Sequence, residues 1–226
     1  MSDAHSGELS RADIEKLVRR PAGIVKQELT IGIKDLASGR GFEGRGVILV
    51  LPRHALRMIL LGPGGTTAMD VWMRDGRFRV AIPALSRVVR GDAATPRAQM
   101  RGMPVDLLWR LLVDPFGSIA FARRGHPDEH GVVSGEGFTA WMRRGPGVAE
   151  VRTRYGNRMG AWFFDHGRLA GIATGSETGL GEATVPTSVD YVGLDPAMEV
   201  RVASASASLV ARSSVSPKVF ADPDGE

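Results

Sequence analysis

The stretch from Phe42 to Pro83 constrains the fold most, because it holds four strand-like segments with no room for a helix between them. In chain order these segments read GFEGRGVILVL, HALRMILLG, TTAMDVWMRDG and GRFRVAIPAL. Asp75 and Gly76 separate the last two, and this pair tolerates the positive φ that a tight hairpin turn requires. The stretch therefore predicts an antiparallel meander that forms the nucleus of the fold.

Apolar and polar residues alternate along the third and fourth segments. One set contains Met69, Val71, Met73, Phe78, Val80 and Ile82, and the other contains Asp70, Trp72, Arg74, Arg77, Arg79 and Ala81. Successive side chains of a strand point to opposite faces of the sheet. We therefore expect the first set to be buried and the second to face water.

Most of the remaining chain also has strand-like patterns. A first strand is expected over 26–34, and further strands over 87–90, 148–155, 158–165, 168–173, 184–192, 198–203 and 206–212. Residues 115–147 are expected to form a long excursion or loosely paired strands, and 219–223 to close the domain. No linker separates two halves, so we expect a flexible tail over 1–8 and a single domain over 9–226.

Two helices are expected beside the sheet. Ser10, with Asp13 in the capping-box position, predicts the start of a short helix that ends at Pro21. The second helix is expected over 104–113, where apolar residues fall at i, i+3, i+4 and i+7: Val105, Leu108, Trp109 and Leu112. A helix this apolar needs a large buried partner, so we expect it to lie across the mouth of the sheet as a lid.

Composition excludes several classes of protein. Cysteine is absent, which excludes disulfides, thiolate metal sites and cysteine nucleophiles. The longest apolar runs, 47–51 and 58–61, are far shorter than the ~20 residues of a membrane-spanning helix. The N-terminus shows no charged-then-apolar leader, so we expect either a cytoplasmic protein or one whose signal peptide was removed.

The charge is strongly basic, with a pI of about 9.9. Between Arg40 and Arg168 there are 20 arginines, no lysine and 11 acidic residues. Such a segment could attract nucleic acid or an anionic membrane surface. We favour water-facing strand positions for these arginines, including Arg77, Arg79, Arg152 and Arg154, because aromatic residues are few and follow no nucleic-acid-binding motif.

The sequence contains no pattern typical of a catalytic site. His126, Asp128, Glu129 and His130 could in principle bind a metal, but Pro127 opposes a helix that would align the histidines. We interpret this segment as a polar loop and expect no metal site. Gly62-Pro63-Gly64-Gly65 lacks the Lys and Ser or Thr of a phosphate-binding loop, so we expect a turn there. We predict a protein that is not an enzyme and has no cofactor.

Several segments resemble the outer-membrane lipoprotein carrier and receptor family (LolA/LolB-like). Residues 56–71 resemble its strand–turn–strand segment with Pro and Gly in the turn, and 102–112 its Gly-Met-Pro-initiated helix. The opening helix and the strands at 26–34 and 44–50 occur in the same order as in that family. Residues 196–202 and 219–224 resemble its closing strands. Where the receptor branch carries a protruding leucine in the turn, this chain has Gly64.

The resemblance implies a mainly β (α+β) fold, an unclosed antiparallel barrel (half-barrel) with a helical lid over an apolar concave face. It also implies a protein of the periplasm or the periplasmic face of the outer membrane, whose partners are lipoprotein acyl chains or other lipids. We further expect a monomer that has no nucleic-acid partner and can contact an anionic membrane surface.

We accordingly hypothesise an envelope protein that shelters acyl chains in this half-barrel. The expected ligand-binding residues are Leu29, Ile31, Ile33, Met58, Leu60, Met69, Val71, Met73, Phe78, Val80, Ile82, Leu108 and Trp109. The main alternative is an envelope scaffold or interaction domain of the same fold whose core its own side chains fill. A third hypothesis is a cytoplasmic or nucleoid-associated basic protein.

Overall fold

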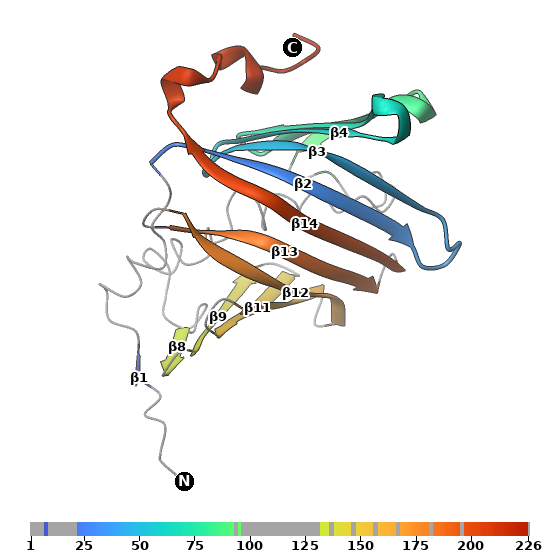
Figure 1. Ribbon diagram of the computed structural model, residues 1–226. Coiled ribbons are helices and arrows are strands. Elements are labelled where there is room, and N and C mark those ends of the chain that lie inside the picture. Colours follow the sequence, from blue (N-terminus) through green and yellow to red (C-terminus); the bar gives the residue numbers. More distant parts are fainter. Residues whose placement is uncertain are drawn as a thin grey trace.

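A computed structural model of the chain describes residues 7–8, 22–92, 95, 132–135, 138–145, 148–155, 158–165, 168–180, 183–194 and 197–225. These residues form one antiparallel sheet in which hairpin-connected strands lie side by side (Figure 1). Its first part contains β2 (Ile24–Asp35), β3 (Gly41–Leu51), β4 (Ala55–Leu61), β5 (Thr67–Arg74), β6 (Arg77–Ile82) and β7 (Arg87–Asp92). Its second part contains β8 (Val132–Gly135), β9 (Phe138–Gly145), β10 (Val148–Tyr155), β11 (Arg158–Asp165), β12 (Arg168–Leu180), β13 (Ala183–Leu194) and β14 (Ala197–Val210).

The pairing of β14 with β2 joins these two meanders. The spatial order runs from β1 (Gly7–Glu8) through β8 to β14, then through β2 to β7. The register extends from Met198 opposite Asp35 to Val210 opposite Ile24, which is nearly the whole length of both strands. The long strands β2 and β14, one from each end of the chain, therefore lie side by side in the middle of the sheet.

The predicted strands are confirmed, with two corrections. The strands expected at 198–203 and 206–212 are one strand, β14, which a bulge between Ser204 and Ser206 interrupts without ending. The expected closing strand at 219–223 is wrong, because Pro217–Phe220 forms a 3-10 helix, η7, outside the sheet. Pro217 has no N–H to donate to a strand ladder, and it suits the first turn of a helix.

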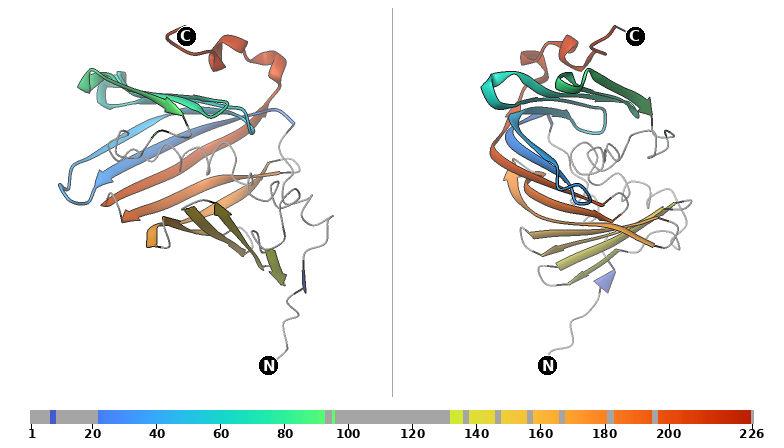
Figure 2. Two further views of the ribbon diagram at one scale, coloured as in Figure 1. Left: turned by 180° about the vertical axis from the view of Figure 1, so that it is seen from behind. Right: turned by 90° about the vertical axis from the view of Figure 1, so that its right-hand side faces the viewer.

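The sheet is strongly curved and does not close into a barrel (Figure 2, right). Bulges interrupt the pairing at Leu60/Leu61, Phe163/Phe164, Ser176/Glu177 and Ser204/Ser206. An extra residue on one strand bends it and increases its local twist. These bulges therefore account for the half-barrel shape.

The concave side of the sheet carries the larger hydrophobic core. Its buried residues come from both meanders and include Leu29, Ile48, Met58, Val71, Val80, Tyr191 and Val200. The register lines them up across neighbouring strands, as Ile48 lies opposite Met58, Met58 opposite Val71, and Val71 opposite Val80. The period-two pattern of the sequence therefore becomes continuous apolar rows across the sheet.

The two expected helices lie outside the described residues. Within the described part of the chain, the helical segments are short 3-10 turns: η1 (Pro63–Gly65), η2 (Pro83–Leu85), η6 (Arg212–Ser214) and η7. Pro63–Gly65 confirms the turn expected between the second and third segments. No helix among these described residues has the length and apolar character needed to cross a bilayer.

Two strand glycines give a matched test of the close packing in the first meander. A Cβ at Gly46 would overlap the carbonyl oxygen of Ile59 and lie 2.9 Å from the Cα of Leu60, whereas one at Gly32 would meet only a carboxylate oxygen of Glu43 at 4.0 Å. We expect Gly46→Ala to lower the free energy of unfolding by about 1–3 kcal/mol, as overpacking does. Gly32→Ala should be neutral or slightly stabilising, by up to about 1 kcal/mol.

Chemical denaturation of both variants beside the wild type checks this prediction. Equal stability of the two variants would show that β3 and β4 can separate enough to accept a methyl group.

Candidate functional site

The residues expected to bind acyl chains converge on the concave face. Leu29, Ile31, Met58, Leu60, Met69, Val71, Met73, Phe78 and Val80 all belong to its buried core. Ile33 and Ile82 are half-buried and pack against that core from its rim. Leu108 and Trp109, the two residues expected from the lid, lie outside the described residues. The face therefore assembles from the first meander as the alternation predicted.

The concave face also includes residues of the second meander that were not among the predicted site residues. Phe163 and Tyr191 are buried there and meet edge to face, with ring centroids 5.9 Å apart and planes at 73°. Gly171 leaves space for the Tyr191 ring, since a Cβ would lie 2.6 Å from its hydroxyl oxygen. Strands were expected at 158–165 and 184–192, but only the β14–β2 pairing places their buried residues on the same concave face as the first meander.

One buried polar side chain, Gln27, connects three strands. Its Nε2 donates to the carbonyl oxygen of Pro186, at 2.8 Å, and to the hydroxyl oxygen of Ser204, at 3.3 Å. These partners belong to β13 and β14, close to the bulges of β12 and β14. Gln27 therefore ties β2 to the most irregular part of the sheet, and the apolar pattern gave no signal for it.

A groove of about 350 Å³ lies at the β2–β3 hairpin, away from the centre of the concave face. Its lining consists of Gly32, Ile33, Lys34, Gly39, Gly41, Phe42, Glu43, Glu199 and Arg201. Four charged residues, Lys34, Glu43, Glu199 and Arg201, line this groove together with apolar Ile33 and Phe42.

The prediction that the convex-face residues point into water is wrong at Trp72 and Ala81. Trp72 and Ala81 were both expected to face water, yet only 2% and 7% of their surfaces are exposed. The C-terminal segment, residues 211–225 and here called the C-terminal strap, passes over the outer side of β4–β6 (Figure 2). Trp72 Nε1 donates to the carbonyl oxygen of Phe220 in this strap, at 3.0 Å. A second, smaller core forms beneath it from Ile24, Ala55 and Phe220.

Arginines on the convex face form a cross-strand row. Arg57 lies opposite Trp72, Trp72 opposite Arg79, and Arg79 opposite Arg90, across β4, β5, β6 and β7. The expectation that Arg79 would be water-facing is wrong, because its side chain is only 11% exposed. Arg57, Arg79 and Arg90 are here called the arginine row. The side chains of Arg152 and Arg154 lie outside the described residues.

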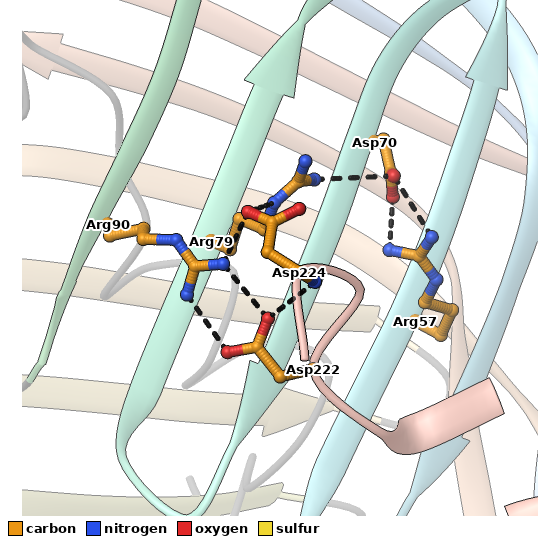
Figure 3. Close-up of polar contacts among 6 residues, drawn as sticks. All are labelled: Arg57, Asp70, Arg79, Arg90, Asp222 and Asp224. Atoms are coloured by element: carbon orange, nitrogen blue, oxygen red, sulfur yellow. Dashed lines mark hydrogen bonds and ion pairs between the residues drawn. The ribbon is translucent and has the colours of Figure 1, made fainter. Parts of the chain in front are cut away.

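Aspartates from the sheet and the strap neutralise the arginine row (Figure 3). Asp70 pairs with Arg57 through two hydrogen bonds and accepts a weaker one from Arg79. Arg90 donates both terminal nitrogens to Asp222, each at 2.9 Å, and also contacts Asp224. Asp224 accepts from Nε of Arg79 at 2.9 Å. Bidentate contacts of this kind are the strong form of a charged hydrogen bond.

The ion pairs shift the proton affinities of the strap. Hydrogen bonding to Arg90, aided by the backbone N–H of Asp224, lowers the pKa of Asp222 to about 2. Hydrogen bonds from Arg79 and Arg90 lower the pKa of Asp224. The hydrogen bonds that Arg90 donates to Asp222 and Asp224 raise the pKa of Arg90. Both aspartates are therefore fully ionised throughout the neutral range.

Several solved structures have a similar fold. A domain from Vibrio parahaemolyticus, described as an outer membrane lipoprotein-sorting protein, matches with a TM-score of 0.58 at 10% identity, over 91% of this chain and 93% of its own. A LolA superfamily protein from Nitrosomonas europaea matches with a TM-score of 0.54 at 12% identity, over 95% and 98%. The chain has the LolA-like fold.

A third protein with the LolA-like fold is a DUF1329 family protein from Desulfovibrio piger, with a TM-score of 0.58 at 13% identity over 97% of this chain and 100% of its own. Compared by sequence, the chain matches no protein-family model and no curated protein. The likeness therefore concerns the fold.

One turn departs from what the resemblance implies for the receptor branch. Gly64, at the position of the protruding leucine, is exposed and has a φ of 78°. This left-handed conformation favours glycine over residues with a Cβ. This LolA-like chain therefore builds the turn without a protruding side chain.

Metal ligands do not cluster in the described part of this LolA-like chain, where no three His, Cys, Asp or Glu residues come together. The segment 125–131, with its two histidines, lies outside the described residues.

The strap should stay bound from about pH 7 to pH 5 and loosen in stronger acid. A carboxyl group with a lowered folded pKa stabilises the fold above its unfolded pKa of 3.8, and this contribution disappears as the pH falls toward about 2. We expect a spin label on Lys218→Cys, the chain's only thiol, to keep its mobility down to about pH 5 and to become progressively more mobile as the pH falls from about 4 toward about 2.

Asp222→Asn should make the same label more mobile at neutral pH, because it removes the charge that Arg90 binds. Asp190→Asn, at an exposed carboxylate outside the strap, is the matched control. A label that responds equally in both variants would contradict the assignment of Asp222 as the main anchor.

Proposed function

We propose that this protein binds acyl chains of lipoproteins or other lipids against its concave face, as an envelope protein of the periplasm or the periplasmic face of the outer membrane. The observation that carries the proposal is the continuous apolar surface formed by cross-strand neighbours, with Met58, Met69 and Met73 among them. Flexible thioethers adapt to irregular apolar ligands. The lipoprotein-sorting description of one protein of the same fold supports this choice of ligand.

The free energy of acyl-chain binding depends on exchanging one set of apolar contacts for another. Burying each methylene of an acyl chain gains ~0.8 kcal/mol, so about ten methylenes gain roughly 8 kcal/mol. The concave side chains are already buried, so an entering chain must replace the contacts that bury them. We propose that the helix expected over 104–113 acts as the lid whose displacement opens this face. Binding then depends on the difference between the two sets of apolar contacts.

We further propose a monomeric protein with no catalytic role, no cofactor and no nucleic-acid partner. Loose attraction of its excess arginines to an anionic membrane surface would add to lipid capture, and salt would weaken that attraction.

An envelope scaffold of the same fold is the second candidate. It is favoured by the near-complete burial of the central concave side chains, since Val71 and Met73 have no exposed surface and Met58 only 1%. A face that is already packed to this degree resembles the filled core of an interaction domain.

Acyl-chain binding can be tested with a fluorescent fatty acid as the probe and phospholipid as the competitor. We expect the wild type to bind the probe, and Val71→Glu and Ile33→Glu to lose about tenfold or more in affinity, because a carboxylate is costly to bury beside an acyl chain. Ile33 lies at the half-buried rim, so its variant can fold even if a charge at Val71 prevents folding. Leu61→Glu is the control, since Leu61 is exposed and lies opposite Arg45.

Circular dichroism and thermal melting establish which variants are folded. Equal probe affinity in wild type, folded Ile33→Glu and Leu61→Glu would place the probe elsewhere. Failure of the wild type to bind any probe would favour the scaffold.

A further inference from the structure

The convex face holds more positive charge than a sheet surface tolerates without a partner. Arg79 lies directly opposite Arg90, and Arg74 directly opposite Arg77, on adjacent strands. Like charges in directly opposed positions of an antiparallel pair destabilise it. Asp70 supplies a carboxylate from within the sheet, and the two that meet Arg90 in Figure 3 come from the C-terminal strap.

The strap is recognised through its main chain as well as its charges. Trp72 Nε1 and Arg74 Nη1 both point to the carbonyl oxygen of Phe220, at 3.0 and 3.4 Å. The Phe220 ring packs beside Ile24 and Ala55, with Leu49 and Leu51 around them. Two residues later, Asp222 is held in a bidentate contact, and its side chain is only 7% exposed. The sheet surface therefore binds three kinds of group on the strap: an aromatic ring, a main-chain carbonyl oxygen and two spaced carboxylates. Binding of this kind is typical of a peptide-binding surface.

We propose that this convex surface, formed by the arginine row with Trp72 and Arg74, is a docking site for an extended acidic segment of a partner protein, and that the C-terminal strap occupies it in cis. The matching segment has an aromatic residue followed at the second and fourth positions by aspartates, as in Phe220-Ala-Asp-Pro-Asp. An anionic lipid surface would satisfy the arginines, but it has no aromatic ring to replace that of Phe220 and no fixed spacing between a carbonyl oxygen and two carboxylates. The site is independent of the concave face, so it does not depend on the proposed lipid binding.

Because the strap occupies the site within the same chain, a partner segment must bind strongly enough to displace it. A tethered segment competes at an effective concentration in the millimolar range. A partner segment must therefore exceed the strap in contacts or arrive in a locally concentrated form. Because charge-assisted bonds supply much of the recognition, added salt should weaken the partner and the strap together.

The test uses the full chain with its own strap disabled. In Asp222→Lys/Asp224→Lys the strap carries charges that the arginine row repels, and the sheet is unchanged. The probe is a fluorescein-labelled peptide of residues 214–226, followed by anisotropy. We expect saturable binding to this variant, about tenfold or more tighter than to the wild type, whose site is occupied.

Four controls define the recognition. A peptide with asparagine at both aspartates, and one with alanine for Phe220, should each bind about tenfold or more weakly. Adding Arg90→Ala to the double variant should remove binding of the parent peptide. Raising sodium chloride from about 50 mM to about 500 mM should also weaken it.

Two results would overturn the proposal. One is equal binding of the aspartate and asparagine peptides. The other is no peptide binding at all, and tight binding of the double variant to phosphatidylglycerol vesicles would then make the surface a lipid site. If the double variant does not fold, a protease site inserted after Ala211 and cut in the folded protein allows the strap to be exchanged for the labelled peptide, and the same criteria apply.

Discussion

The pairing of β14 with β2 is the interaction on which the rest of the structure depends. It joins two hairpin meanders that are each local in sequence, and it extends over nearly the whole length of both strands. Without it, the apolar rows of β2–β6 and the aromatic pair of Phe163 and Tyr191 would belong to separate sheets. Because the strap begins immediately after β14, the same pairing also delivers Phe220, Asp222 and Asp224 to the outer face of β4–β7.

The sheet uses its two faces for different chemistry, and alternation along one strand separates them. Val71 points into the concave core, while its neighbour Trp72 points outward and is buried beneath the strap. A register slip of one residue would exchange these environments. The bulges and Gln27 hold the curved part of the sheet in place, so the concave face is continuous across the junction of the two meanders.

The strap changes the interpretation of the basic character of the chain. Arg79 and Arg90 carry charges that the composition assigned to a solvated surface, yet in the fold their partners are specific aspartates. Net charge alone therefore overstates how much of this protein is free to attract anions. The LolA-like fold supplies the half-barrel, and the chain's own C-terminus determines what the outside of β4–β7 presents.

The sequence by itself determined the strands of the first meander and their inward-facing residues, because hairpin turns and period-two alternation are local properties. Met58, Met69, Val71 and Val80 could be assigned to one buried face for that reason. Only the tertiary structure decided that β14 continues through its bulge, that Gln27 reaches Pro186, and that Trp72 is covered. Each of these depends on residues more than a hundred positions apart, and their contacts leave no periodic signal in the chain. Arg79 and Arg90 look water-facing in any local pattern, since their carboxylate partners in the strap lie at the far end of the sequence.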